Sequence, residues 1–170
     1  MKHPSSNRIS FEHYRATDRY RFIELFTDHR AMKHIGDGPL SESEANVLWK
    51  KLTEDFYPAG IYTIWALFAI DDARYLGHAS LRPRPEFPDE WEIGYILRTE
   101  EWGNGLGTEA AKALVRFGFE YRAFKKLYAT VDDDHGASIH VLKKAGFRFE
   151  RFDHDEEGKY SVFSVGKQNS

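Results

Sequence analysis

Hydrophobic and polar positions recur along the chain in blocks that predict short strands and helices. Alternating apolar residues in Arg8–Arg15 predict a first strand. A helical pattern follows Asp18, which with Thr17 offers an N-cap. A second helix is expected behind Ser41, because Ser41 and Glu44 have the spacing of a capping box. The pattern therefore places two helices after the first strand.

The middle of the chain is rich in β-branched and aromatic residues and predicts three strands. These are Ile61–Ile70, Tyr75–Leu81 and Trp91–Leu97. A turn at Asp71-Asp72 joins the first two into a hairpin. A loop is expected before the third strand, where the prolines gather: Pro83, Pro85 and Pro88.

The C-terminal part of the pattern alternates helices and strands. A helix with Ala111 and Leu114 follows Glu109, a strand covers Leu127–Val131, and a helix covers Ser138–Ala145 with Gly146 as its C-terminal stop. A closing hairpin is expected from Phe147–Phe152 and Tyr160–Val165. The order β-α-α-β-β-β-α-β-α-β-β predicts one α/β (α+β) domain with a mixed sheet covered by helices.

Length and composition exclude several classes. A chain of 170 residues fits one domain. It has no cysteine, which excludes disulfides, thiolate metal sites and a cysteine nucleophile, and which suits the cytoplasm. A net charge of −3 argues against general nucleic-acid binding. The longest apolar run, Ile61–Ile70, is too short for a membrane span of about 20 residues, and the N-terminal pattern is not that of a signal peptide.

A glycine-rich loop, Gly103-Asn-Gly-Leu-Gly107, lies between a predicted strand and a predicted helix. Glycines allow a backbone to approach a ligand closely, and the free N–H groups of a helix N-terminus attract phosphate. The spacing matches neither a Walker loop, which needs a lysine, nor the dinucleotide loop, because Thr108 occupies its last glycine position. On its own the loop fits a phosphate site or a simple turn.

With its flanks, the loop resembles the GNAT superfamily of acyl-CoA N-acyltransferases. Gly105 and Gly107 match the motif Arg/Gln-x-x-Gly-x-Gly/Ala, and Trp102 stands in the Arg/Gln place, as in the branch of ribosomal-protein N-terminal alanine and serine acetyltransferases. A second match is Asp132-x-x-His-x-x-Ser138, and a third is Arg15-x-x-Asp18 near the start. The resemblance covers about residues 8–165 of a single domain spanning 1–170.

The resemblance implies a fold and a donor. The fold is a mostly antiparallel central sheet in which two parallel strands, Trp91–Leu97 and Leu127–Val131, splay apart to admit acetyl-CoA. His135 stands where the family usually has asparagine, and it is expected at the cofactor with Ser138. The backbone groups expected to bind the pyrophosphate and the pantetheine are those of Trp102, Gly103, Asn104, Gly105, Leu106, Gly107 and Thr108, and of Ile96, Leu97 and Arg98.

The reaction implied is direct attack of an amine on the thioester in a ternary complex. Ser138 is the candidate that protonates the departing thiolate; the alternative is a helix-capping residue. Glu92 is the candidate base, and the alternative is an ion-paired strand carboxylate. His78, on the neighbouring strand, is a second candidate base or a structural histidine.

The acceptor is the open question. The branch favours a protein N-terminus; a small amine such as an amino acid, a polyamine or an antibiotic is the alternative. Two further hypotheses are non-catalytic acyl-CoA binding and ATP binding by the glycine loop. We expect no metal, with Asp132–Asp134 as a solvated loop, no membrane or general nucleic-acid partner, and a monomer or homodimer. Aromatic candidates for the acceptor site, each with core packing as its alternative, are Phe26, His34, Trp65, Trp91 and Tyr160.

Overall fold

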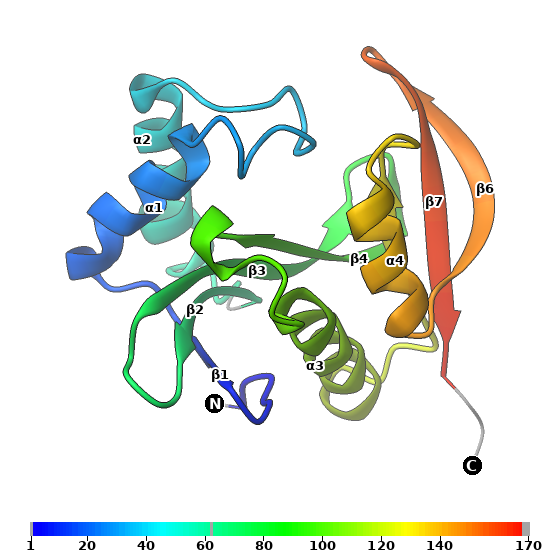
Figure 1. Cartoon of the computed structure of the whole chain (residues 1–170), viewed down its shortest axis with the longest axis horizontal. Coiled ribbons are helices and arrows are strands. Elements are labelled where there is room, and N and C mark those ends of the chain that lie inside the picture. The colour runs from blue at the N-terminus through cyan, green and yellow to red at the C-terminus, as the bar shows by residue number, and fades with distance from the viewer. Residues whose placement is uncertain (1, 62, 168–170) are drawn as a thin grey trace.

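A computed structural model describes residues 2–61 and 63–167. Its centre is a seven-stranded sheet in the order β1-β2-β3-β4-β5-β7-β6 (Figure 1). The strands are β1 Ile9–Glu12, β2 Ile64–Ala69, β3 Tyr75–Arg84, β4 Phe87–Leu97, β5 Lys126–Val131, β6 Arg148–Asp155 and β7 Gly158–Gly166.

Helices cover both faces of this sheet. Figure 1 shows α1 and α2 on one side of β3 and β4, and α3 on the other. The elements have the predicted order. The helices are α1 Arg19–Thr27, α2 Glu42–Lys50 with a π-helical extension Lys51–Phe56, α3 Leu106–Tyr121 and α4 Gly136–Lys144, with 3-10 turns at Ala16–Asp18 and Thr99–Glu101.

Two apolar cores lie on opposite faces of the sheet, because successive strand residues point to opposite sides. On β3, Ala79 and Leu81 are fully buried in the core beneath α3. The alternate residues His78 and Ser80 lie toward α1 and α2, whose core contains Phe22. The strands β3 and β4 therefore contribute one set of side chains to each layer.

The sheet opens between β4 and β5. These strands are parallel, whereas every other neighbouring pair is antiparallel. Their register consists of one pair, Glu92 with Tyr128, so β4 diverges from β5 beyond that point. The predicted fold class, a mostly antiparallel sheet with two splayed parallel strands, is confirmed.

The proline loop predicted between the second and third central strands is wrong. β3 runs through Pro83 to Arg84, and β4 begins at Phe87, so only Pro85 and Glu86 lie between the strands. The register shifts between Pro83 and Arg84, and such a bulge accommodates a residue without an N–H donor.

Other boundaries follow local chemistry. The capping box is confirmed: the Ser41 hydroxyl accepts from the Glu44 amide at 3.2 Å, and the Glu44 carboxylate accepts from the Ser41 amide at 2.7 Å. β2 begins at Ile64, later than predicted, and residue 62 of the predicted strand lies outside the described residues. Within the described part of the chain, no helix has the length and apolar character needed to span a bilayer.

Candidate active site

A cavity of about 420 Å³ lies between the end of β4, the start of α3 and α4. The glycine loop forms one wall. Gly103 and Gly105 have φ values of +79° and +78°, which L-residues with a side chain rarely adopt, and a Cβ on Gly103 would point into open space. The loop therefore presents backbone rather than side chains to the cavity, as the predicted phosphate-binding role requires.

Two side chains fix this loop in place. Arg8 donates to the Glu109 carboxylate at 2.7 Å and to the Asn104 carbonyl at 2.9 Å. The Trp102 indole donates to the Leu97 carbonyl at 3.2 Å. The loop is thus held between β1, β4 and the first turn of α3.

A second cavity, of about 360 Å³, lies between the α1–α2 layer and the β3–β4 strands. We call the first the donor cavity and the second the acceptor cavity. They meet where the sheet opens. The residues that line both are His34, Ile35, Tyr95, Ile96, His135 and Ser138.

Ser138 and Tyr95 face each other at this junction. The Ser138 hydroxyl lies 3.4 Å from the Tyr95 hydroxyl. Burial raises the pKa of Tyr95, and the hydrogen bond from Ser138 acts in the opposite direction. Ser138 is the third residue of α4, whose N-cap is His135, and its hydroxyl contacts Tyr95, which favours the site role over the capping alternative.

Tyr95 was not among the sequence candidates. It comes from β4 rather than from the helix that carries Ser138, so no spacing along the chain joins the two. The available signal was strand alternation, since Tyr95 and Ile93 share the face that is covered by α3.

Glu92 faces the acceptor cavity at the position where β4 pairs with Tyr128 of β5. Its carboxylate accepts from the Thr130 hydroxyl at 2.9 Å and lies 3.6 Å from the Arg84 guanidinium. The side chain is 22% exposed. It is therefore ion-paired, as the structural alternative required, and also open to a ligand, as a base requires.

His78 is held by other side chains. Its Nδ1 lies 3.0 Å from the Tyr14 hydroxyl, which lies 2.9 Å from the Tyr75 hydroxyl. Burial, together with the nearby charge of Arg82, lowers the pKa of His78 to about 3. A neutral ring anchored by a buried tyrosine pair fits the structural alternative better than the role of a base.

The rings of His34 and His135 stack across the junction, with centroids 4.2 Å apart and planes at 19°. Burial and the neighbouring His34 lower the pKa of His135. Nδ1 of His34 lies 3.6 Å from both the Asp132 and the Asp134 carboxylates. These three side chains are close enough to share a cation, and the predicted absence of a metal stays a prediction.

Several predicted contacts lie elsewhere. The Arg98 amide donates to the Leu76 carbonyl at 2.9 Å, and the Trp102 amide donates to Thr99 at 3.3 Å, so both are already used. Asn104 is adjacent to the donor cavity without lining it. The remaining predicted donor-site residues line the donor cavity: Ile96, Leu97, Trp102, Gly103, Gly105, Leu106, Gly107, Thr108, His135 and Ser138.

The aromatic candidates divide in the same way. Phe26 and His34 line the acceptor cavity. Trp65 is 1% exposed in the core beneath α3, so its predicted acceptor role is wrong. Trp91 stacks on Phe124 at 4.7 Å, which is the core-packing alternative.

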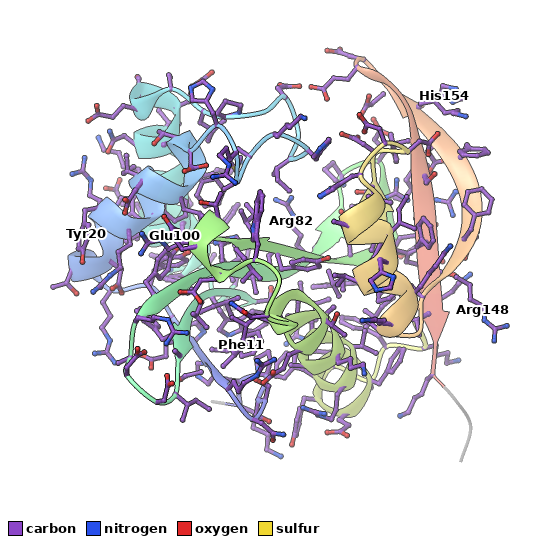
Figure 2. The ribbon with its side chains drawn as sticks, viewed as in Figure 1. Phe11, Tyr20, Arg82, Glu100, Arg148 and His154 are labelled. Atoms are coloured by element: carbon purple, nitrogen blue, oxygen red, sulfur yellow. The ribbon has the colours of Figure 1, made fainter. Side chains whose placement is uncertain are left out.

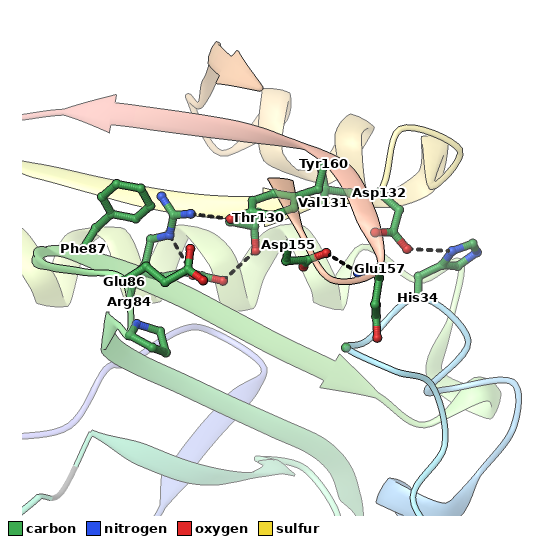
Figure 3. A pocket seen from close by; sticks show the side chains of 13 residues that line it. His34, Arg84, Glu86, Phe87, Thr130, Val131, Asp132, Asp155, Glu157 and Tyr160 are labelled. Atoms are coloured by element: carbon green, nitrogen blue, oxygen red, sulfur yellow. Dashed lines mark hydrogen bonds and ion pairs between the residues drawn. The ribbon is translucent and has the colours of Figure 1, made fainter. Parts of the chain in front are cut away.

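A third cavity, of about 260 Å³, adjoins the acceptor cavity and includes the remaining candidate, Tyr160. Figure 3 shows the Arg84 guanidinium beside the Phe87 ring at one side of it. The residues that line both of these cavities are His34, Gly36, Glu92, Thr130 and Val131. Four further carboxylates line the third cavity: Glu86, Asp132, Asp155 and Glu157.

Curated relatives of the chain include the following two proteins. An uncharacterized protein, YkkB of Bacillus subtilis (strain 168), is 33% identical over 129 residues, which is 75% of this chain and 73% of that protein. The spermidine N(1)-acetyltransferase of Escherichia coli (strain K12) is 39% identical over 59 residues, 35% of this chain and 32% of that enzyme.

Solved structures share the fold. AAC(6')-Ib, solved in complex with paromomycin and acetyl-CoA, aligns with a TM-score of 0.76 at 14% identity over 95% of this chain and 94% of that chain. A protein from Vibrio cholerae, assigned as a ribosomal-protein-serine acetyltransferase, aligns with a TM-score of 0.76 at 17% identity over 96% and 97%.

A family model described as an acetyltransferase (GNAT) domain matches residues 8–148, which is most of the chain. The matched region contains β1, the glycine loop, β4 and β5, and the whole of α4. With the donor cavity built on that loop, the chain belongs to the GNAT acetyltransferase family and is an acetyl-CoA-dependent N-acetyltransferase.

Proposed function

We propose that the protein transfers the acetyl group of acetyl-CoA directly to a primary amine while both substrates are bound. The observation that supports this most strongly is the junction of the two cavities at Tyr95, His135 and Ser138. Such a junction lets a donor and an acceptor meet without a covalent enzyme intermediate. A chain without cysteine also has no thiol to carry an acetyl group.

The donor cavity has the groups that acetyl-CoA needs. Backbone N–H groups of Gly103–Thr108 and the positive end of α3 suit the pyrophosphate. Arg30 and Lys144 add positive charge at the cavity wall. Ile96 and Leu97 line the donor cavity where β4 diverges from β5, and this edge is our candidate to bind the pantetheine amides.

Residues at the junction account for the proton transfers. A bond forms between the amine nitrogen and the carbonyl carbon, the carbon–sulfur bond breaks, the amine loses a proton and the thiolate gains one. Glu92 lies on the acceptor side and is our candidate to take the amine proton. Ser138, with Tyr95 behind it, is our candidate to donate to the sulfur.

The acceptor we favour carries an α-amino group. Support comes from the likeness in fold to the Vibrio cholerae protein, whose assignment names a ribosomal protein as its substrate. An apolar-walled acceptor cavity of about 360 Å³ is of a size for one residue at a peptide N-terminus or for a free amino acid.

A polycationic amine is the second candidate. The acid-lined third cavity next to Glu92 favours it (Figure 3), because carboxylates attract an ammonium group. The Escherichia coli relative is named for spermidine.

The test is CoA release from acetyl-CoA with a panel of peptides, free amino acids, spermidine and an aminoglycoside. Release with any of these acceptors supports the proposal, and the best acceptor identifies the class. Acetyl-CoA binding without CoA release for any amine would contradict catalysis and support non-catalytic acyl-CoA binding. ATP that competes with acetyl-CoA in a thermal-shift titration would contradict the donor assignment.

A further inference from the structure

One guanidinium in the acceptor cavity has no ion-pair partner. Arg82 lies on β3 and lines this cavity but not the donor cavity. Its side chain rises from the sheet between the α1–α2 layer and α4 (Figure 2). Among residues 2–61 and 63–167, no carboxylate oxygen lies within 4.0 Å of its nitrogens. A positive charge therefore stands unneutralised where the acceptor must bind.

The missing partner is unexpected from the register. Arg82 lies directly opposite Glu92 on the neighbouring strand, and directly opposed charges on one face of a sheet ordinarily pair. The Glu92 carboxylate is instead engaged by Arg84 and Thr130. Because Arg84 and Thr130 engage the Glu92 carboxylate, Arg82 is available to bind a ligand.

Arg84 shows what a structural arginine looks like in the same strand. Its side chain is only 4% exposed. It donates to Glu90 at 2.5 Å, to Asp153 at 3.1 Å and to the Tyr160 hydroxyl at 2.9 Å. Arg82, by contrast, is exposed and has none of these contacts, so packing does not explain its place in the cavity.

The wall on the other side of the acceptor cavity is apolar. It comes from α1, α2, the π-helical extension and β2. A ligand that spans the cavity therefore meets a hydrophobic surface at one side and a cation at another. The apolar residues of this wall are Phe22, Phe26, Leu48, Leu52, Phe56 and Ile64.

We propose that the acceptor carries a carboxylate beside its amine, and that Arg82 binds this carboxylate. An α-amino acid with an apolar side chain is the simplest such molecule: its amine faces Glu92, its carboxylate faces Arg82, and its side chain enters the apolar wall. An acidic side chain at a peptide N-terminus offers the same chemistry from another source. This inference rests on the proposed acetyl transfer.

Matched acceptors test the inference. We would measure kcat/KM for L-leucine and L-leucinamide, and for L-phenylalanine and its amide. Each pair shares its amine and side chain but differs in the carboxylate. The amide has the more readily deprotonated amine, so a preference for the acid cannot come from basicity. If the carboxylate accepts a charged hydrogen bond from Arg82, kcat/KM should be about 10- to 100-fold higher for the acid than for the amide. The difference should lie mainly in KM.

Variants connect the preference to Arg82. Arg82→Gln should abolish the preference by lowering kcat/KM far more for the acids than for the amides, and Arg82→Lys should retain part of the preference. Arg19→Gln is the control, because Arg19 is exposed on α1, contacts Asn46 and lines none of the three cavities. A preference that survives Arg82→Gln would overturn the inference.

Other outcomes are equally decisive. Equal use of acid and amide, or a preference for spermidine, would overturn the inference while leaving acetyl transfer intact. An Arg82-dependent preference for Asp-leucinamide over Ala-leucinamide would support carboxylate binding and assign it to an acidic peptide N-terminus. Absence of CoA release with every amine would contradict the proposed function itself.

Discussion

The hydroxyl of Ser138, on α4, lies 3.4 Å from the hydroxyl of Tyr95, on β4. The pair joins two elements that meet where the donor and acceptor cavities meet. A proton donated from Ser138 can be replaced from Tyr95, so the two hydroxyls can act as one unit.

We therefore predict that Ser138→Ala and Tyr95→Phe each lower kcat by about 100-fold, with little change in the KM for acetyl-CoA. The double variant should be no slower than the slower single variant. Steady-state kinetics of the four proteins measure this. Tyr20→Phe is the control, because Tyr20 is 62% exposed on α1. Losses that multiply in the double variant would show that the hydroxyls act independently.

Glu92→Gln should lower kcat/KM for the acceptor by about 100-fold near neutral pH. The loss should shrink as pH rises toward the amine's own pKa, about 8 for a peptide α-amino group, since more of the amine is then unprotonated without help. The pH–rate profile measures this. Glu90→Gln is the matched control, because it also removes a carboxylate that pairs with Arg84. Glu90 lines none of the three cavities. A profile of unchanged shape would return Glu92 to a purely structural role.

Gly103 and Gly60 form a matched pair for the donor loop. Both have φ of +79°, and a Cβ on either would meet nothing within 4 Å. Alanine at either position should cost about 1 kcal/mol of stability. Only Gly103→Ala should also weaken acetyl-CoA binding, by about 10-fold, because its backbone faces the donor cavity. Urea unfolding and calorimetric titration measure the two effects; equal affinity in both variants would contradict the loop assignment.

His78 should make the protein sensitive to acid. Its pKa in the folded state is about 3, below the ordinary 6.5. The unfolded chain therefore binds a proton that the folded one does not, and stability falls as pH drops from about 6.5 toward 3. The slope is at most about 1.4 kcal/mol per pH unit. His78→Gln should flatten the fall in unfolding free energy between pH 6.5 and 4.5, as measured by urea titration.

The control for that experiment is His154→Gln, since His154 is exposed on β6 (Figure 2). It should leave the acid slope of the wild-type protein unchanged. An identical slope in His78→Gln and wild type would mean that His78 becomes protonated without unfolding the chain.

The order of elements was accessible from the sequence because it depends on local signals. Ser41 and Glu44 begin a helix through contacts three residues apart, and Gly146 ends one through its own φ of +94°. Pro83 misled because its effect depends on a neighbour: a bulge in the β3–β4 pairing lets the strand continue. Proline restricts a strand only where its missing N–H is needed.

The active site was accessible only in part, for the same reason. The glycine loop is contiguous in sequence, so its spacing could be compared with a family motif. Tyr95 reaches Ser138 from 43 positions away, and Arg84 holds Glu92 across two strands. Such pairs depend on how elements distant in sequence are placed in space, which the periodicity within one element does not specify.

Because β4 and β5 share one residue pair, the sheet consists of two antiparallel parts. One part is β1-β2-β3-β4 and the other is β5-β7-β6. Strand pairing holds each part together. The contact between the two parts depends on Glu92, Tyr128 and the helices that pack against both. A donor bound between β4 and β5 would supply hydrogen bonds that these two strands do not make with each other. The sheet would then be most rigid with acetyl-CoA bound, and its two parts would be most free to move apart after CoA has left.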